Sequence, residues 1–301
     1  MTGATGFIGR HLANNLAGRD WLVTSMQRSN AAVDGIGETI IVPEFAPAAI
    51  AAALSGRHFQ LVFHLAGYGV KPNERDIDMM FDINVDATRA IVRQSGLLGA
   101  EAVVIGGSGA EYDFTDAEGP VSEDCALQSR SLYGASKAAG SLAALATAGA
   151  IGLPLAVARL FGVFGPGEAP HRLLPSLVNA LSKRERVSLS PGLQRRDALY
   201  VQDAVDALVA IALRIRLDPQ QLIVNVCSGG APTVREFAET VADVMEVPRA
   251  LLGFGDIAAR PDDVASFAGC PDRLYRLTGW KPSHTLSSGI RVAVDDMKAR
   301  A

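Results

Sequence analysis

Short apolar runs alternate with helix-like segments through the first half of the chain. The runs rich in β-branched residues predict strands at 21–26, 39–42, 61–67, 102–107 and 155–162. Helical periodicity lies between them, at 9–18, 47–57, 83–99 and 131–150. Apolar strands that alternate with helices form parallel sheets covered on both faces. The pattern therefore predicts a doubly wound α/β fold of Rossmann type, whose ligands bind beyond the carboxyl ends of the strands.

The regular alternation stops near residue 165, where proline and glycine become frequent. Helices are predicted at 173–184, 201–215 and 233–247, with one clear strand at 222–228. We expect two interleaved domains. Residues 1–165 with about 196–227 form the Rossmann domain, and residues 166–195 with about 228–301 form a smaller mixed α/β domain.

Composition and charge exclude several classes of protein. A chain of 301 residues with 49% hydrophobic and 20% charged residues has the balance of a soluble globular protein with a large core. A net charge of −4 gives no electrostatic reason to expect nucleic acid as a partner. The apolar stretches are broken by glycine and proline, so we predict no transmembrane span and no signal peptide. The three cysteines lie far apart without metal-ligand spacing, which favours a reducing cytoplasm and predicts no metal site.

A glycine turn opens the chain, with Gly3, Gly6 and Gly9 spaced three apart. A predicted helix follows at once, so the glycines would let the backbone approach a dinucleotide pyrophosphate at the helix N-terminus. Only Met1 and Thr2 precede the turn, where a buried central strand is normally found. The first strand is therefore predicted to be truncated, and we expect the natural protein to carry about four to six apolar residues before Thr2.

The end of the predicted strand at 21–26, which is the second strand once the truncated first strand is counted, bears on the choice of coenzyme. In NAD-binding proteins an acidic residue there holds the ribose 2′-hydroxyl. This chain has no Asp or Glu at that point and places Gln27 and Arg28 there instead. An arginine pairs well with a 2′-phosphate, which favours NADP(H) over NAD(H). A plain surface arginine is an equally good interpretation.

Tyr133 and Lys137 lie four residues apart on a predicted helix, so their side chains share one face. A lysine ammonium stabilises a phenolate, and this pairing is expected to lower the pKa of Tyr133 by up to about three units. Tyr133 would then exchange a proton with a carbonyl or hydroxyl group near neutral pH. Ser108 ends a predicted strand, where its hydroxyl is placed to polarise the same substrate oxygen.

Several motifs in order resemble the extended short-chain dehydrogenase/reductase family, specifically its nucleotide-sugar epimerases, dehydratases and ketoreductases. They are TGATGFIG at the start, HLAG at 64–67, Asn84 in INVDAT, Ser108, YGASK at 133–137 and QRRDALYVQDAVDA at 194–207. The separation of 25 residues from Ser108 to Tyr133 matches the family layout. The resemblance runs from Thr2 to about Lys281.

The resemblance implies roles for individual residues. Ser108, Tyr133 and Lys137 would form a catalytic triad, with Tyr133 as acid/base, Ser108 as partner of the reacting oxygen and Lys137 as phenolate stabiliser and ribose ligand. The residues expected to bind the coenzyme are Gly3, Thr5, Gly6, Phe7, Ile8, Gly9, Gln27, Arg28, Leu65, Ala66, Gly67, Asn84, Tyr133 and Lys137. Those expected to contact substrate are Ser108, Gly109, Arg172, Arg196 and Arg260, with Arg196 and Arg260 gripping the diphosphate of a nucleotide-linked sugar.

Departures from the family pattern reduce the number of reactions that the site is expected to catalyse. Dehydratases of the family carry an acidic pair after the catalytic hydroxyl, where this chain has Gly109 and Ala110. Glu111 comes one position too late, and one residue at a strand end turns a side chain away. Double epimerases carry a cysteine at the position of Ala110. Relatives often have an asparagine where Gly162 stands, and His171 is expected to be a polar loop residue or a sugar contact.

We therefore expect an NADP(H)-preferring 4-ketoreductase that acts on a 4-keto-6-deoxy sugar linked to a nucleoside diphosphate. The alternative is an NAD-dependent nucleotide-sugar 4-epimerase, which uses the same residues but retains its coenzyme. A non-catalytic NADP(H)-sensing binding protein is less favoured, because such proteins often lose the tyrosine and lysine. In this interpretation the Rossmann domain binds NADP(H), or else NAD(H), and the smaller domain binds substrate. The helices that start near Asn84 and Tyr133 would pair two subunits into a homodimer.

Overall fold

A parallel sheet forms the centre of the computed structural model, which describes residues 1–115, 119–128, 130–259 and 264–299. The strands run in the order β2, β1, β3, β4, β5, β10, and Thr2 lies between β1 and β3 through single bridges to Met26 and His64. Their bounds are β1 (Thr24–Gln27), β2 (Glu38–Ile41), β3 (Leu61–His64), β4 (Ala102–Ser108), β5 (Leu155–Leu160) and β10 (Gln221–Val226). This arrangement confirms the predicted doubly wound fold.

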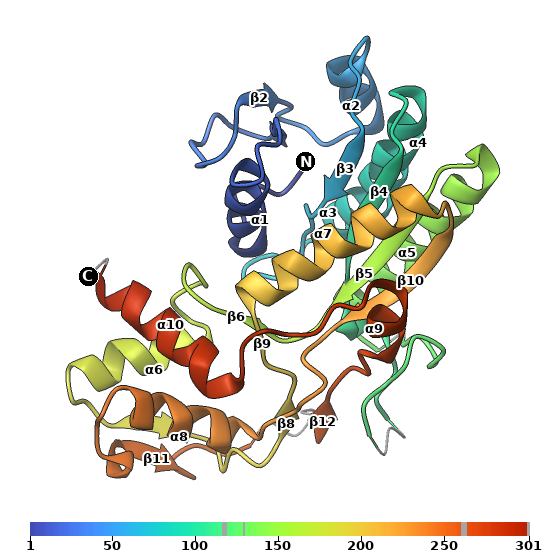
Figure 1. Cartoon of the computed structure of the whole chain (residues 1–301). Coiled ribbons are helices and arrows are strands. Elements are labelled where there is room, and N and C mark those ends of the chain that lie inside the picture. The colour runs from blue at the N-terminus through green and yellow to red at the C-terminus, as the bar shows by residue number, and fades with distance from the viewer. Residues whose placement is uncertain (116–118, 129, 260–263, 300–301) are drawn as a thin grey trace.

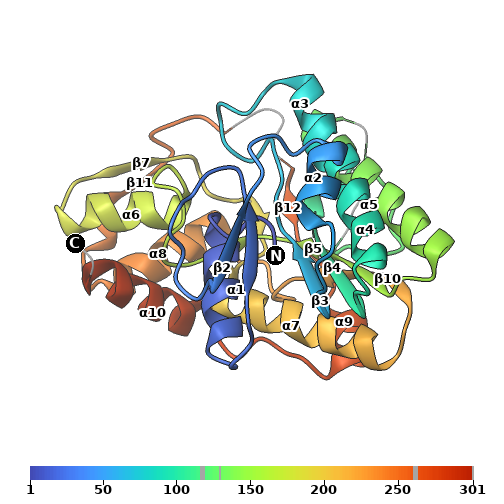
Figure 2. The ribbon, with the colours of Figure 1, turned by 90° about the horizontal axis from the view of Figure 1, so that it is seen from above.

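Helices cover both faces of the sheet (Figures 1 and 2). One face carries α1 (Phe7–Ala17), α7 (Val201–Leu217) and α9 (Asp272–Thr278), and the other carries α2 (Pro47–Leu54), α4 (Thr88–Leu97) and α5 (Leu132–Ile151). Successive strand residues point to opposite faces. Val104 accordingly packs into the core beside α7, whereas Val103 and Ile105 pack into the core beside α5. None of the described helices is long and apolar enough to span a membrane.

The second half adds a smaller mixed region beside the sheet (Figure 1). Its helices are α6 (Leu173–Ser182), α8 (Val234–Val244) and α10 (Leu286–Ala299), with a short turn η3 (Arg249–Leu251). Short parallel pairs join β6 (Val163–Phe164) to β9 (Leu199–Tyr200), β7 (Val187–Leu189) to β11 (Leu252–Phe254) and β8 (Arg195–Arg196) to β12 (Ser266–Phe267). The helix α9 comes from the segment expected in the second domain but packs against α7 and β10.

The predicted helix at 83–99 is divided in the structure. It begins as α3 (Ile77–Phe81), continues as a π-helical segment η1 (Asp82–Ala87) and ends as α4. The first predicted strand, at 21–26, starts three residues later than expected, as β1. The sequence interpretation also missed α9, α10 and the short strands β6, β7, β8, β9, β11 and β12. Elements of two to seven residues carry little periodicity, which accounts for α9 and these strands but not for α10, which has 14 residues.

Thr2 occupies the central strand position of the sheet. Its backbone N–H donates to the Phe63 carbonyl at 2.9 Å, and the Met1 carbonyl accepts from the Met26 N–H at 2.8 Å. The Met1 amino group donates to the Thr24 carbonyl at 2.6 Å, and burial lowers the pKa of this amino group to about 5. The expectation that further residues precede Thr2 in the natural protein stays a prediction.

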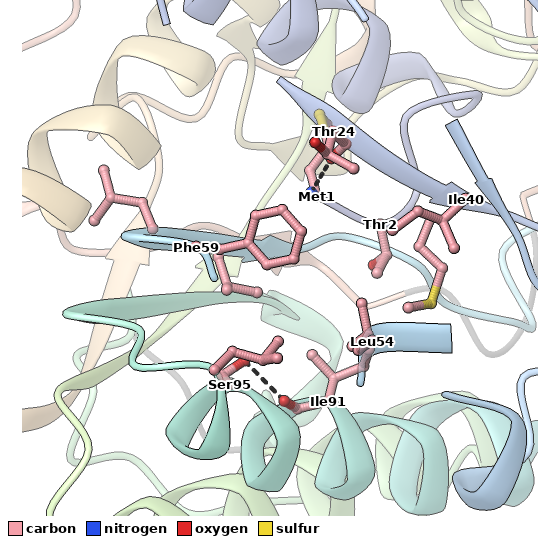
Figure 3. Close-up of a pocket in the computed structure, with 12 residues that line it drawn as sticks. Met1, Thr2, Thr24, Ile40, Leu54, Phe59, Ile91 and Ser95 are labelled. Atoms are coloured by element: carbon pink, nitrogen blue, oxygen red, sulfur yellow. Dashed lines mark hydrogen bonds between the residues drawn. The ribbon is translucent and has the colours of Figure 1, made fainter. Parts of the chain in front are cut away.

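An apolar groove adjoins Met1 and Thr2 between β1 and β3 (Figure 3). It holds about 400 Å³ of empty space, including its open mouth. Side chains of Leu54, Phe59 and Ile91 line its walls. None of the three predicted catalytic residues lines this groove, so it is separate from the candidate active site.

Candidate active site

The glycine turn is folded tightly against the end of β3. Gly3 has a left-handed φ of 74°, and a Cβ there would lie 2.6 Å from the Leu65 carbonyl carbon. A Cβ on Gly9 would lie 2.0 Å from the Gly3 carbonyl oxygen, which also accepts from the Gly6 N–H at 3.0 Å. Only glycine fits at Gly3 and Gly9 without moving backbone. The turn is therefore shaped for the close approach of a ligand.

The N-terminus of α1 is open to an anion. Gly6 is its N-cap, no side chain among the described residues caps it, and its first turn contains no acidic residue. Phe7 and Ile8 start the helix, and Thr5 is exposed beside it. Free N–H groups and the helix dipole at such an end bind phosphate. The turn and helix together fit the pyrophosphate of a dinucleotide coenzyme.

The end of β1 carries the residues expected to choose between coenzymes. Gln27 is buried, and its amide, turned to satisfy its neighbours, donates to the Ser29 and Ala31 carbonyls at 3.2 and 3.1 Å. Gln27 thus holds the loop that follows β1. Arg28 comes next and is exposed, so its guanidinium is available to a ligand.

The variant Gly9→Ala is expected to lower the free energy of unfolding by about 1–3 kcal/mol and to weaken coenzyme binding, because its methyl group meets backbone that cannot yield. Thermal unfolding and coenzyme titration measure both effects. Gly149→Ala in α5 is the matched control, since a Cβ there meets nothing within 4 Å. That change should stabilise the helix by about 0.5–1 kcal/mol. Equal unfolding temperatures for the two variants would show that the turn has room for a side chain.

Ser108 ends β4 and caps the short helix η2 (Gly109–Glu111). Its hydroxyl accepts from the Ala110 N–H at 3.1 Å. Gly109 packs closely against two aromatic rings, since a Cβ there would lie 2.9 Å from Phe161 and from Phe267. The carboxyl end of β4 therefore has a fixed turn that places Ser108 where a doubly wound fold binds its ligand.

Tyr133 and Lys137 lie in the first turns of α5, as predicted. Ser131 caps this helix by accepting from the Gly134 N–H at 3.1 Å. The Lys137 ammonium is buried and donates to the Gly106 carbonyl on β4 at 2.7 Å. Tyr133 and Ser108 interact through their hydroxyl groups, which lowers the pKa of Tyr133. The structure thus brings the three predicted catalytic residues together at the junction of β4 and α5.

The pKa of Tyr133 corrects one expectation. Burial is its largest influence and raises the pKa above the usual value for tyrosine. The expected lowering by Lys137 is therefore wrong for this arrangement. Burial also lowers the pKa of Lys137, while the charge of Glu111 raises it. Desolvation, which the sequence does not report, outweighs the proximity of two side chains on one helix face.

Asn84 lies in η1, where the π-helical turn projects it toward α5. Its amide nitrogen donates to the Ser136 hydroxyl and to the Tyr68 carbonyl, both at 2.9 Å, and its amide oxygen accepts from the Tyr68 N–H at 2.9 Å. Gly140 of α5 makes the approach possible, since a Cβ there would lie 2.0 Å from the Asn84 carbonyl oxygen. Asn84 fixes the segment that contains Gly67 beside Lys137, next to the predicted coenzyme site.

Arg172 is the N-cap residue of α6, and its guanidinium lies 3.5 Å from the Glu168 carboxylate. The charge of Arg172 lowers the pKa of Tyr133, so the two residues are in electrostatic reach. This is the position expected for a substrate contact near the reacting group. His171, next to it, is exposed.

Arg196 in β8 donates to the Val264 carbonyl at 2.9 Å, whereas Arg260 lies outside the described residues.

The packing around Gly162 explains why the asparagine of the family pattern is missing. A Cβ at Gly162 would lie 1.9 Å from the Asp197 carbonyl oxygen, so the backbone of the 195–199 segment takes the space that a side chain would need. Within the described ranges, no group of His, Cys, Asp and Glu side chains could hold a metal ion.

A buried ion pair below Ser108 escaped the sequence interpretation. The sequence predicts only that Glu111 turns away from the position of the dehydratase acid. In the structure it is buried in the interior, and its carboxylate contacts the Arg159 guanidinium at 2.7 Å. The pair joins residues 48 positions apart. No local motif marks it.

The fold and the site define a dinucleotide-dependent enzyme with a serine, tyrosine and lysine at the carboxyl end of a parallel sheet. Residues 1–227 match the model of the NAD dependent epimerase/dehydratase family. The chain belongs to this family, which confirms the resemblance to the extended short-chain dehydrogenases/reductases.

Relatives and solved structures span nearly the whole chain. The GDP-6-deoxy-D-mannose reductase of Pseudomonas aeruginosa is 27% identical, over 100% of this chain and 97% of its own length. The structure of RMD from Pseudomonas aeruginosa complexed with NADPH is 26% identical, with a TM-score of 0.80, and covers 99% of this chain and 98% of its own. The structure of MoeE5 in complex with UDP-glucuronic acid and NAD is 28% identical, with a TM-score of 0.85 and coverage of 100% and 98%.

Proposed function

We propose that the protein is an NADP(H)-preferring reductase that acts on a 4-keto-6-deoxy sugar linked to a nucleoside diphosphate. The observation that carries the proposal is the grouping of Ser108, Tyr133 and Lys137 with no accessible acid next to Ser108 in the described segment 102–115. Glu111 is buried and paired with Arg159, and Gly109 and Ala110 have no acidic side chain. Such a site can exchange a hydride and a proton but lacks the acid that eliminates water from a sugar.

Each residue has a definite task in this reaction. When bound, NADPH supplies a hydride to the C4 carbonyl carbon. Tyr133 donates its phenolic proton to the carbonyl oxygen, while the Ser108 hydroxyl donates a hydrogen bond to the same oxygen as negative charge develops on it. Lys137 binds the ribose of the coenzyme. Arg196, on β8 of the smaller region, is the cation that we propose for the diphosphate of the substrate, because a guanidinium pairs with phosphate oxygens in a fork.

The relatives support a reductase. The match to the reductase of Pseudomonas aeruginosa covers nearly the full length of this chain and of the reductase. The RMD structure from that organism holds NADPH. Arg28, exposed at the end of β1 with no acidic residue beside it on that strand, suits a coenzyme with a 2′-phosphate.

A nucleotide-sugar 4-epimerase is the second candidate. It is favoured by the structure of a UDP-galactose 4-epimerase, which is 25% identical to this chain with a TM-score of 0.80. The structure of MoeE5, 28% identical with a TM-score of 0.85, holds UDP-glucose and NAD. An epimerase would use Tyr133 and Ser108 in the same way. It would keep its NAD through the reaction and need none added.

The two functions differ in how the coenzyme behaves. The purified protein is to be assayed for NADPH oxidation with 4-keto-6-deoxy sugars linked to GDP, dTDP and CDP, and its bound coenzyme is to be quantified after denaturation. We expect turnover that requires added NADPH. Stoichiometric bound NAD together with interconversion of 4-epimers, without added coenzyme, would replace the reductase by the epimerase. Coenzyme binding without turnover of any of these sugars would favour a sensor.

The variant Arg28→Ala is expected to raise the KM for NADPH about 10–100-fold and to leave the KM for NADH nearly unchanged, because only NADPH carries the 2′-phosphate. Initial rates with the two coenzymes measure this. Arg89→Ala is the control, since Arg89 is an exposed arginine of α4 paired with Asp86. A parallel rise for both coenzymes would mean that Arg28 does not read the 2′-phosphate.

We also infer a cytoplasmic homodimer. The helices α4 and α5 pack side by side, and their outer surfaces expose Leu97, Leu142 and Ile151 at 72%, 52% and 47%. Exposed leucine and isoleucine side chains on neighbouring helices suit a subunit interface.

A further inference from the structure

A buried ion pair supports the turn that carries Ser108. The side chains of Glu111 and Arg159 are 0% and 1% exposed, and Glu111 Oε2 accepts from Arg159 Nε at 2.7 Å. The other carboxylate oxygen of Glu111 accepts from the backbone N–H of Ser108 at 2.8 Å. One carboxylate therefore joins the backbone of the predicted catalytic serine to a fixed cation. We call these two residues the Glu111–Arg159 pair.

The Glu111–Arg159 pair fills the space beside Gly107 of β4. A Cβ on Gly107 would lie 2.8 Å from Glu111 Oε1 and 3.1 Å from Arg159 Cγ. Arg159 is directly opposite Gly107 on β4 and opposite Asn225 on β10. The pair thus lies against the strand one residue before Ser108, and the absence of a side chain at Gly107 allows the contact.

The Tyr112 ring holds Arg159 in place. Its guanidinium carbon lies 4.3 Å from the centre of the Tyr112 ring, a cation–π contact. The Tyr112 hydroxyl donates to Asn225 Oδ1 at 2.7 Å, and the Asn225 N–H donates to Glu123 at 2.8 Å. These contacts connect the carboxyl ends of β4, β5 and β10.

Stability alone does not account for a buried pair. Removing two charges from water costs several kcal/mol per ion, and well-packed apolar residues often replace such a pair without loss of stability. A charged pair at this position has an effect that an apolar pair would lack. Its negative member lies in electrostatic reach of two predicted catalytic residues, Tyr133 and Lys137.

The charges that face Tyr133 come from several elements. On its own helix lies Lys137. From β4 and η2 come the hydroxyl of Ser108, which lowers the pKa of Tyr133, and the carboxylate of Glu111, which raises it. Arg172 at the start of α6 lowers this pKa, and Glu74 in the loop after β3 raises it.

We propose that the Glu111–Arg159 pair is a positioning unit of the active site, in which Glu111 fixes the backbone of Ser108 and places a permanent negative charge near Tyr133 and Lys137. This charge keeps Lys137 protonated and keeps the proton on Tyr133 until it is transferred to substrate. The inference rests on the proposed role of Tyr133 as the proton donor. Glu111 is 0% exposed, so it acts through Ser108, Tyr133 and Lys137 as a positioning residue.

The variant Glu111→Gln tests the proposal, because it keeps an acceptor oxygen for the Ser108 N–H and removes the charge. We expect the pKa of Tyr133 to fall by about 0.5–1 unit. Ultraviolet difference titration of the tyrosinate, with the signal of Tyr133→Phe subtracted, measures this without any turnover. In the reductase assay we expect kcat to fall about 10–100-fold, the KM for the sugar to change less than about threefold, and the basic limb of the pH profile to move to lower pH.

Two further variants keep the test decisive. Glu123→Gln makes the same substitution at another buried glutamate and should leave the Tyr133 titration in place. Glu111→Gln combined with Arg159→Met removes both charges, so it stays informative if the single variant does not fold. The pKa of Tyr133 in the double variant should lie below that of the wild type and, when the single variant folds, above that of the single variant. An unmoved titration in folded Glu111→Gln, or a fall in kcat without movement of the basic limb, would overturn the proposal. Absence of sugar reduction by the wild type would instead reject the proposed function and leave the titration result valid.

Discussion

Replacing Tyr133 by phenylalanine is expected to lower kcat about 10²–10⁴-fold while NADPH binds with nearly unchanged affinity. The change removes one oxygen atom, the group that donates the proton to the sugar carbonyl. It leaves the glycine turn, Arg28 and the Lys137 ammonium in place. Steady-state rates with the nucleotide sugar measure kcat, and the fluorescence of bound NADPH measures coenzyme affinity.

Tyr275→Phe serves as the control, since Tyr275 is 47% exposed in α9 and lies among residues that the site does not use. It should keep the activity of the wild type. If Tyr133→Phe kept more than about a third of wild-type kcat, proton transfer would have to come from another group. If coenzyme binding were lost as well, Tyr133 would be a structural residue of the coenzyme site.

The sheet was predictable from sequence because its strands are apolar on both faces. Val103 and Ile105 face α5 while Val104 faces α7, so the strand is apolar at every position and indicates a parallel sheet. The π-helical segment η1 was not predictable. An extra residue in one turn leaves the apolar periodicity of the surrounding helix almost unchanged, yet it sets the direction in which Asn84 points.

The predicted catalytic residues were found because each is marked by its place in the chain. Ser108 ends an apolar strand, and Tyr133 and Lys137 share one helix face. The Glu111–Arg159 pair had no such mark, because it forms only when β4 and β5 lie side by side and Gly107 leaves a space. The pKa of Tyr133 was also beyond sequence, since it depends on how completely the folded chain removes the phenol from water.

The variant Asp197→Asn is expected to stabilise the protein above neutral pH. Asp197 follows Arg196 and is 3% exposed. Its Oδ1 accepts from the Ser228 N–H at 2.9 Å, and its Oδ2 is buried with no hydrogen-bond partner in the part of the chain that the structure describes. Burial raises the pKa of Asp197 from 3.8 to about 7, while neighbouring backbone N–H groups oppose the rise. An ionised carboxylate with one unpaired oxygen is thus forced into the interior at high pH.

The sign of the effect follows from proton binding. Between pH 4 and 7 the folded state holds the Asp197 proton more tightly than the unfolded state, so the free energy of unfolding falls as pH rises through this range. A shift of about three units corresponds to about 4 kcal/mol, of which about 3 kcal/mol is lost between pH 5 and pH 8. An amide cannot ionise, so Asp197→Asn should gain about 3 kcal/mol on the wild type over that interval, or roughly 5–10 °C in Tm.

The stability gained by Asp197→Asn must depend on pH if the ionisation of Asp197 causes it. At pH 5 the variant should be no more stable than the wild type, because its amide N–H group replaces a protonated carboxyl and finds no acceptor in the described surroundings. Asp256→Asn provides a control of opposite sign, since Arg186 contacts the Asp256 carboxylate at 2.9 Å and holds its pKa below the usual value. Relative to the wild type, that variant should be less stable by a constant amount from pH 5 to pH 8, where Asp256 is ionised in both the folded and the unfolded state, and this deficit should disappear as the pH falls below 3.8. A Tm difference between Asp197→Asn and the wild type that stayed constant from pH 5 to pH 8 would show that Asp197 is already ionised in the folded state at pH 5, and would contradict the raised pKa.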